Sequence, residues 1–490
     1  MSDLETAQLP ADQLRRVVID PVSRVEGHGK VTLLLDQDNR VQQARLHIVE
    51  FRGFEHFIQG RPYWEVPVMV QRLCGICPVS HHLAACKALD LVMGVDTLTP
   101  TALKLRRLMH YGQILQSHAL HFFHLSSPDL LFGFDADVGL RNIVGVLERY
   151  PDIGRQGVML RKFGQEVIRA TAGKRVHGTG SVPGGVNRSL SDEDRALLLR
   201  DAAQNVAWAE QAVAIVAEMH RQDAQRFDHF AEFESSFMSL VGPQGEFDLY
   251  DGALRCTTAQ GETVFDQANV QGYLDLITEE VKPWSYMKFP FLQSMGPEQG
   301  WYRVGPLARV QVCSRMPTPL AEAARRDFVG ETSGSKRMRH GSLHYHWARM
   351  IEMLCAAETV AELLADDDVQ GQSLMASGKR RREGVGVIEA PRGTLIHHYQ
   401  VGDDDLVTMA NLIVSTTHNN QAMNTAVREV ARTHFDGRAV TEGLLNHIEV
   451  AIRAYDPCLS CATHALGQMP LEVKVIDAQG QLVDSRIRTG

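Results

Sequence analysis

Hydrophobic and polar residues alternate near the start of the chain, in the pattern of a small antiparallel sheet. Between residues 17 and 50 three runs alternate in this way, and the polar segment 36–39 separates the last two of them. A period of two places one face of each strand against a core, and short segments rich in Asp and Asn form turns. We therefore expect strands at residues 17–19, 30–35 and 44–49.

Most of the remaining chain has the hydrophobic spacing of helices. Hydrophobic residues recur every three or four positions from Pro100 to Leu125. Ser191 and Asp194 resemble a capping arrangement, so a long helix should begin there. Residues 235–320 mix turns with short strand-like segments, and residues 384–388 have the pattern of a strand. Further helices are expected at residues 340–365, 405–415, 420–434 and 441–454.

These patterns predict a mainly α protein with smaller β parts (α+β), in which a bundle of long helices forms the core and an N-terminal antiparallel sheet is added. We expect a β-rich segment at residues 1–60 and a mainly helical core with interleaved subdomains at 61–464. A C-terminal extension at 465–490 has the pattern of a hairpin. The sequence has no internal repeat or low-complexity linker that would separate domains more sharply.

Composition narrows the class of protein. The chain has 490 residues, of which 44% are hydrophobic and 22% are charged, as in ordinary folded proteins. Its net charge of -9 argues against a nucleic-acid partner. The basic run 379–382 indicates a solvated loop or a patch facing another protein. No window approaches 18 uncharged apolar residues and no signal peptide is evident, so we expect no membrane span and a cytoplasmic location.

Two C-x-x-C pairs carry the chemistry. Cys74 pairs with Cys77 and Cys458 with Cys461, and two such pairs can give one metal ion four sulfur ligands. Alone, each pair could also be a redox pair, two buried thiols or half of a zinc site. In zinc ribbons the pairs lie within roughly 15 to 20 residues of each other, whereas here they lie at opposite ends of the chain. A metal used for chemistry is therefore favoured. The other four cysteines are expected to be structural: Cys86, Cys256, Cys313 and Cys355.

The residues around these pairs carry a resemblance to a known family. The segments R-L-C-G-I-C-P-V-S-H (72–81) and D-P-C-L-S-C-A-T-H (456–464) resemble the two cysteine signatures of the nickel-iron hydrogenase large subunit. The resemblance covers essentially the whole chain, and among the branches it is most similar to the hydrogenase subunit of cytoplasmic NAD-reducing enzymes. Further matching motifs are R-V-E-G-H (24–28), F-R-G-F-E (51–55), G-P-L-A-R (305–309) and E-A-P-R-G (389–393).

The resemblance implies a nickel-iron centre at the four cysteines. Cys74 and Cys458 would bind nickel terminally, and Cys77 and Cys461 would bridge nickel to an iron that carries carbon monoxide and cyanide. Hydrogen is then split heterolytically and reversibly, with Cys458 taking the proton. Glu26 matches the carboxylate through which protons leave the site. It lies between the first two expected strands, where a carboxylate is more often solvated.

Four further residues have roles by resemblance. Arg392 would lie over the vacant position between the metals, where an arginine would otherwise simply pair with an acid. Glu55 and the side chain of His464 would bind a magnesium-type cation, a hard ion that prefers oxygen. His81 resembles a histidine that donates a hydrogen bond at the cluster. Asp129 matches a carboxylate near the open coordination position. We assign no metal to His118, His121 or His124.

The resemblance also implies partners and maturation. No leftover cysteine set could hold an iron-sulfur cluster and no Rossmann or Walker fingerprint occurs, so we expect neither a cluster nor a nucleotide in this chain. An iron-sulfur small subunit is implied, with a flavin- and NAD-binding diaphorase module. Residues 465–490 resemble the extension that a maturation protease removes after His464, once nickel and iron insertion proteins have loaded the site.

Two related functions compete with this interpretation. A hydrogen-sensing regulatory subunit keeps the same site, but such sensors commonly lack the C-terminal extension. A non-catalytic relative of the large quinone-site subunit of respiratory complex I shares the fold without the cysteines, and all four are present here. A plain zinc protein would explain the thiols but not Glu26, Glu55 and Arg392 in their motifs.

Overall fold

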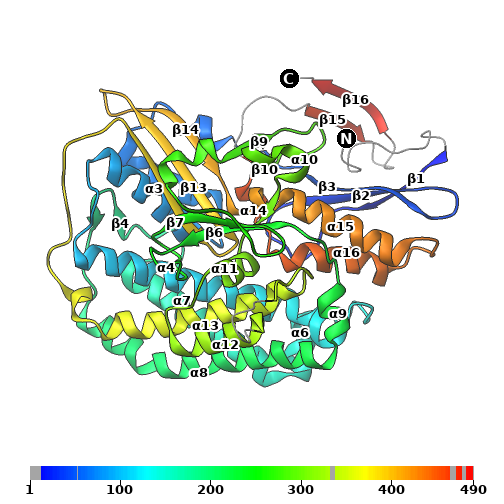
Figure 1. The fold of residues 1–490 in the computed structure, drawn as a ribbon, viewed down its shortest axis with the longest axis horizontal. Coiled ribbons are helices and arrows are strands. Elements are labelled where there is room, and N and C mark those ends of the chain that lie inside the picture. Colours follow the sequence, from blue (N-terminus) through cyan, green and yellow to red (C-terminus); the bar gives the residue numbers. More distant parts are fainter. Residues whose placement is uncertain (1–12, 52, 331–336, 464–470, 477–481, 489–490) are drawn as a thin grey trace.

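The N-terminal sheet forms where the alternation predicts it. The computed structural model describes residues 13–51, 53–330, 337–463, 471–476 and 482–488. Strands β1 (Arg15–Ile19), β2 (Gly29–Leu35) and β3 (Val41–Ile48) pair antiparallel in the order β1-β2-β3. Helices α15 (Asn420–Phe435) and α16 (Glu442–Ala454) lie beside this sheet on the right of Figure 1, and α15 packs on β3.

Four long helices form the helical core in the lower half of Figure 1: α4 (Pro100–Leu120), α7 (Pro151–Ala172), α8 (Asp192–Gln222) and α13 (His344–Ala365). Helix α4 packs on α7, while α13 packs on both α4 and α8. The Ser191 side chain accepts a hydrogen bond from the Asp194 N–H at 3.2 Å and so caps α8 as predicted. The helices expected at 340–365, 420–434 and 441–454 are also present, as α13, α15 and α16.

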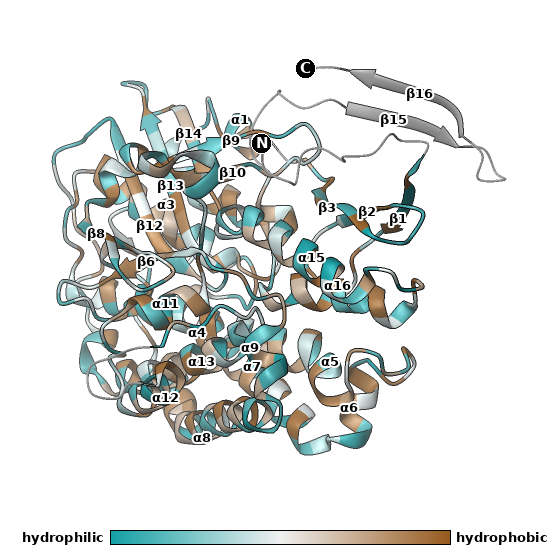
Figure 2. Ribbon diagram, turned by 45° about the vertical axis from the view of Figure 1, so that its right-hand side comes forward, coloured by the Kyte–Doolittle hydropathy of each residue, from teal (hydrophilic) through white to brown (hydrophobic). Residues whose placement is uncertain are grey.

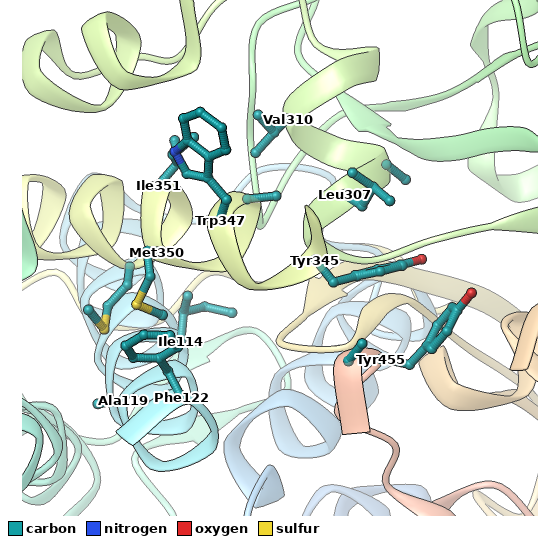
Figure 3. Close-up of a cluster of buried hydrophobic side chains, with 14 of the residues drawn as sticks. Ile114, Ala119, Phe122, Leu307, Val310, Tyr345, Trp347, Met350, Ile351 and Tyr455 are labelled. Carbon is teal, nitrogen blue, oxygen red and sulfur yellow. The ribbon is translucent and has the colours of Figure 1, made fainter. Parts of the chain in front are cut away.

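Close packing joins α13 to its neighbours. Figure 3 shows Met350 of α13 near Ile114 and Phe122, and Ile351 near Val310 of α11 (Pro306–Val312). All of these side chains are buried. Tyr345, at the start of α13, stacks obliquely on Tyr455 with ring centroids 4.6 Å apart (Figure 3). Because Tyr455 directly precedes the second cysteine segment, the helical core fixes the position of that segment.

A second antiparallel sheet lies against helix α3 (Pro78–Val92). Its strands β12 (Glu383–Ala390), β13 (Gly393–Val401) and β14 (Val407–Ile413) pair in that order. Figure 2 shows mostly hydrophobic colours in β12 and α3. Gly386 allows the close contact, because a Cβ there would lie 2.3 Å from the Ala84 carbonyl oxygen. The sheet thus brings β12 and β13 directly against the helix that follows Cys77.

The helix predicted at residues 405–415 is wrong, because this segment forms strand β14. Leu406, Met409, Ala410 and Ile413 recur at helical spacing, which explains the prediction. Antiparallel pairing with β13 overrides that spacing, and Val407 and Ile413 are buried in the sheet.

Shorter elements complete the fold. Residues 235–320 form short strands and turns as predicted, and β15 and β16 pair antiparallel as the expected C-terminal hairpin. No helix among the described residues is long and apolar enough to cross a membrane. The remaining elements are α1 (Phe54–Phe57), η2 (Tyr63–Glu65), α2 (Val66–Met69), η3 (Val70–Leu73), the π-helix η4 (His121–Ser126), α5 (Ser127–Phe132), α6 (Ile143–Arg149), β4 (Ser181–Val182), β5 (Gly185–Val186), α9 (Ala224–His229), β6 (Ser236–Val241), β7 (Ala253–Thr257), β8 (Thr263–Ala268), η5 (Val270–Asp275), β9 (Ile277–Glu280), β10 (Phe289–Leu292), η6 (Gln293–Met295), α10 (Gly296–Gln299), β11 (Tyr302–Arg303), α12 (Pro319–Val329), η7 (Asp367–Gln370), α14 (Ser415–His418), η8 (Leu459–Cys461), β15 (Leu471–Ile476) and β16 (Leu482–Arg488).

Candidate metal centre

The four cysteines of the two C-x-x-C pairs meet in one buried cluster. The Sγ atoms of Cys74 and Cys458 lie 3.0 Å apart, and those of Cys458 and Cys461 lie 3.1 Å apart. Cys77 completes the group, with its Sγ 3.9 Å from Cys458 and 3.8 Å from Cys461. All four thiols are free and at most 5% exposed. The two ends of the chain therefore supply one site, as the paired motifs predict.

Local backbone structure points each pair of sulfurs the same way. Cys74 follows η3 and Cys77 precedes α3, and the N–H groups of Ile76 and Cys77 donate to Cys74 Sγ at 3.2 and 3.3 Å. In the second pair, the Cys458 N–H donates to the Thr416 hydroxyl at 2.9 Å, and η8 carries the chain to Cys461. Both turns are therefore held by hydrogen bonds within this chain.

The charges on the thiols indicate a site built for a cation. Hydrogen bonds, first from Cys458 and then from Cys461, hold the pKa of Cys77 well below its usual range. Burial raises the pKa of Cys458 and of Cys461. Four thiolates this close together would repel one another. A bound metal cation offsets this repulsion with its positive charge, and it favours loss of the thiol protons. Ligands at about 2.3 Å from one metal lie about 3.8 Å apart, which matches the distances from Cys77 Sγ, whereas Cys458 Sγ lies closer to Cys74 and Cys461. Thiolates are soft donors that suit a metal such as nickel or iron.

Glu26 lies directly beside the second cysteine segment. Its backbone forms an isolated parallel β-bridge with Cys458, and its carbonyl accepts the Leu459 N–H at 3.0 Å. The Ser460 hydroxyl donates to Glu26 Oε1 and the Ser460 N–H lies 3.3 Å from Oε2. A half-buried carboxyl group is thus held against the second cysteine segment.

Arg392 is a buried cation beside the cluster. Its Nη2 donates to Asp456 Oδ1 at 3.0 Å and its Nη1 to the Ser117 hydroxyl at 3.3 Å. Burial alone would lower the pKa of Arg392, but Asp456 and the thiols of Cys458 and Cys77 raise it well above its usual range. Burial also raises the pKa of Asp456 to about 6, against the opposing effect of Arg392.

The turn that carries Arg392 is held in place by a second buried arginine, Arg309. Arg309 donates to the carbonyls of Ala390 at 2.7 Å and Pro391 at 3.1 Å. The same guanidinium forms buried ion pairs with Glu352 at 2.6 Å and Glu389 at 2.9 Å. The G-P-L-A-R and E-A-P-R-G motifs therefore form one unit that holds Arg392 at the cysteines.

Comparison with known proteins decides the family. A family model described as "Nickel-dependent hydrogenase" matches residues 52–133 and 246–464, and one described as "HoxL-like" matches residues 16–51. The chain is 50% identical over 489 residues to the NAD-reducing hydrogenase HoxS subunit beta of Cupriavidus necator, covering 97% of this chain and 100% of that one. The chain belongs to the nickel-dependent hydrogenase family. It is the catalytic large subunit, and its fold and cysteine signatures agree with that membership.

Other relatives of this hydrogenase support the assignment. One component of the F420-non-reducing hydrogenase of Methanothermobacter marburgensis is 40% identical, with 96% of this chain and 99% of that one covered. The crystal structure of an NAD+-reducing NiFe-hydrogenase in the H2-reduced state superposes with a TM-score of 0.90 at 58% identity, covering 92% and 99% of the two chains. A NiFeSe-hydrogenase from Dm. baculatum, at 21% identity, shares the fold with a TM-score of 0.73 over 92% and 100%.

Glu55 of the hydrogenase is half-buried. Its Oε1 accepts the Leu412 N–H of β14 at 2.9 Å. Burial raises the pKa of this carboxyl group, although nearby Lys288 opposes the shift. The expected magnesium-type site at this carboxyl group stays a prediction. Its expected second ligand, His464, lies outside the described residues.

His81 and Asp129 occupy different surroundings. His81 lies one helical turn after Cys77, and its hydrogen bond is one of the contacts that lower the pKa of that thiol. Asp129 instead accepts hydrogen bonds from Arg24 at 2.6 Å and Arg453 at 2.9 Å. It thereby ties the link that carries Glu26 to helix α16, and its expected place near the open coordination position stays a prediction.

Sequence reasoning missed the partners of Arg392. Asp456 stands in the quoted D-P-C motif without an assigned role, and it has a left-handed backbone (φ 53°), a conformation that clusters at functional sites in residues other than glycine. Ser117 lies between residues of ordinary helical spacing in α4, so no local signal distinguishes it. The Ser460 hydroxyl, inside the second C-x-x-C, could have been suspected from its position alone.

Proposed function

We propose that this hydrogenase chain splits hydrogen reversibly into protons and electrons at its four cysteines. Cys74 and Cys458 would hold nickel, and Cys77 and Cys461 would hold both nickel and an iron that would carry carbon monoxide and cyanide. When bound, this centre supplies the electron-accepting metals that heterolytic cleavage of hydrogen needs. The observation that carries the proposal is the buried group of four free thiols, with a cation, Arg392, and an acid, Glu26, fixed beside it.

Protons leave through residues of this chain. Cys458 takes the proton, and Glu26 receives it, since the two residues are paired through their backbones. The Ser460 hydroxyl bonded to the Glu26 carboxylate keeps that side chain directed toward the cysteine loop. Arg392 provides a fixed positive charge in a buried site, where it stabilises developing negative charge more strongly than it would in water. Asp129 supports the site indirectly, through Arg24 and Arg453.

A cation of the magnesium type is proposed next to β14. Glu55 and His464 would supply its ligands, and the burial of the Glu55 carboxyl group supports a charged partner there. The extension at 465–490 is removed after His464 by a maturation protease, once insertion proteins have loaded nickel and iron. Loss of the extension would leave His464 as the C-terminal residue.

Electrons leave through a partner protein. The four cysteines outside the site, Cys86, Cys256, Cys313 and Cys355, are all buried, and the described cysteines gather in one group only. A small subunit with iron-sulfur clusters therefore receives the electrons. The relative from Cupriavidus necator is an NAD-reducing hydrogenase, which supports NAD+ as the final acceptor. A flavin-containing diaphorase module and a cytoplasmic location are part of the same proposal.

Hydrogen-dependent NAD+ reduction by the purified complex tests this proposal. The Glu26→Gln variant keeps the size of the side chain and one acceptor oxygen but cannot carry a proton. Turnover should fall by about 100-fold or more, the usual contribution of a general acid or base, while nickel content stays at the parent level. A parent complex that holds nickel yet reduces no acceptor under hydrogen would contradict the catalytic role.

A further inference from the structure

A line of three buried side chains leads away from the bridging cysteine. His81 Nδ1 lies 3.2 Å from His397 Nε2, and His397 Nδ1 lies 2.6 Å from the Tyr399 hydroxyl. The three residues are at most 1% exposed. Cys77 is the residue that directly precedes α3, and His81 lies four residues further on, one helical turn away on the same side of the helix.

The fold explains why these residues meet. His397 and Tyr399 are two positions apart on β13, so their side chains leave the same face of the strand. Helix α3, which carries His81, packs on β13. Tyr399 belongs to the same buried cluster as Cys77 and the other site cysteines. His398, between them, points to the opposite face, where it contacts Tyr273 and Glu383.

Hydrogen-bond chemistry fixes the direction of the line. A neutral histidine has one N–H and one acceptor nitrogen, and a tyrosine hydroxyl has one proton to donate. Among the described residues, the Tyr399 hydroxyl has His397 Nδ1 as its hydrogen-bond partner. If Tyr399 donates to Nδ1, then the N–H of His397 lies on Nε2 and donates to His81 Nδ1. The N–H of His81 then lies on Nε2, so this nitrogen is the one that can donate a hydrogen bond to the Cys77 thiolate.

The reverse direction is unfavourable. It would leave the Tyr399 proton buried without an acceptor among the described residues, and an unsatisfied buried donor is unfavourable. It would also turn an unprotonated nitrogen of His81, with its lone pair, toward the thiolate. Both effects favour the direction that begins at Tyr399.

We infer that His397 and Tyr399 are positioning residues that hold His81 in the tautomer donating Nε2–H to the bridging thiolate of Cys77. This inference rests on the proposed function, because it assigns the line an effect on the iron that Cys77 is proposed to bind. A hydrogen bond to a thiolate withdraws electron density from the sulfur and so from the metal, and such bonds tune metal-sulfur sites. Tyr399 thereby influences the metal centre without touching it.

Infrared spectroscopy of the purified, metal-loaded complex provides the test. With less electron density on iron, less is donated back to carbon monoxide, and its stretching frequency is higher. The Tyr399→Phe variant should therefore shift the iron carbonyl band to lower frequency. Tyr302→Phe is the matched control: Tyr302 is equally buried and its hydroxyl lies 2.7 Å from His418 Nδ1, but His418 Nε2 has no hydrogen-bond partner among the described residues.

A pair of variants at the middle position separates hydrogen bonding from packing. In His397→Gln the side-chain amide can still accept from Tyr399 and donate to His81, so the band should stay near the parent position. In His397→Leu the line is broken, and the band should shift as in Tyr399→Phe. Equal bands in the Gln and Leu variants, or equal shifts in Tyr399→Phe and Tyr302→Phe, would overturn the inference.

The infrared bands distinguish a wrong metal centre from a wrong role for His397 and Tyr399. If the parent complex has no carbonyl or cyanide bands, the proposed metal centre itself is wrong. If the parent has these bands and no variant moves them, only the role of His397 and Tyr399 is wrong. Should Tyr399→Phe fail to load metal, the Gln and Leu variants at position 397 still decide the question.

Discussion

Glu26 and Cys458 form an isolated parallel β-bridge between the first and the last parts of the described core. The bridge joins the proposed proton acceptor to the cysteine proposed to release the proton. Gly27 makes this approach possible, since a Cβ at this position would lie 2.6 Å from the Ser460 nitrogen and 2.9 Å from the Leu459 Cβ. The contact between the two segments is therefore as tight as the backbone allows.

We predict that Gly27→Ala separates the two segments and slows proton transfer. The added methyl group has no room, and the residue has φ +83°, where side chains other than glycine are strained. Exchange between H2 and D2O, measured in the purified complex, should fall at least about tenfold, because misplacing a catalytic group by about 1 Å can cost 100-fold.

Gly60→Ala is the control for backbone strain alone. Gly60 has a similar φ of +77°, but a Cβ there would meet nothing within 4 Å. This variant should keep the parent exchange rate, apart from a small loss of stability. Equal exchange rates in the two variants would contradict a role for the close contact.

Substitution of a site cysteine should remove the metal, whereas substitution of a structural cysteine should not. Cys77→Ser removes a thiol whose pKa is held low by its neighbours, and we predict loss of nickel from the purified protein. Cys86→Ser is the matched control on the same helix: burial raises the pKa of Cys86 to about 12, so it stays a thiol. Metal analysis that finds full nickel in Cys77→Ser, or none in Cys86→Ser, would contradict the assignment.

Arg309 should contribute strongly to stability, because its positive charge balances two buried carboxylates. Arg309→Met leaves Glu352 and Glu389 without this partner, and removing one partner of a buried ion pair costs about 3 to 5 kcal/mol. Arg382→Met breaks an exposed pair with Asp403 and should cost about 1 kcal/mol or less. Denaturant unfolding of both variants checks the difference, and similar losses would contradict it.

Lowering the pH should destabilise the fold at pH values well above those at which the carboxyl groups titrate. Burial lowers the pKa of His82 and His110 to about 4 and of His418 to about 3. Unfolded histidines titrate near 6.5, so from about pH 6.5 down to 4 the unfolded chain binds protons that the folded chain does not. Stability therefore falls over this window as the pH decreases.

Thermal unfolding of the purified complex between pH 7.5 and 4.5 measures this effect. The melting temperature should decrease steadily below about pH 6.5, and the decrease should be smaller in His418→Gln, which removes one of the groups. A melting temperature that is constant down to pH 4.5 would show that the buried histidines do not control acid stability.

The sequence alone was enough to predict the functional residues that lie in short motifs of characteristic spacing. Cys74, Cys77, Cys458 and Cys461 could be grouped because thiol pairs are rare and their spacing has a geometric meaning. The N-terminal strands and the capped helix at Ser191 followed from local pattern. These features depend on neighbours in sequence, so a single chain carries the information.

Features that depend on packing could not be predicted. Residues 407–413 have helical spacing and became a strand because β13 offers a partner. Ser117, Asp456 and Arg392 come from three distant segments, and no local pattern links them. The line from Tyr399 to His81 likewise requires knowing which face of β13 meets α3.

The central claim is that the four thiols hold a nickel-iron centre. Infrared spectroscopy of the protein purified with its partners, combined with metal analysis, tests it most directly. We predict one nickel per copy of this chain, together with bands of iron-bound carbon monoxide and cyanide, all lost in Cys77→Ser. Mature protein that contains zinc at the four cysteines and shows none of these bands would contradict the claim.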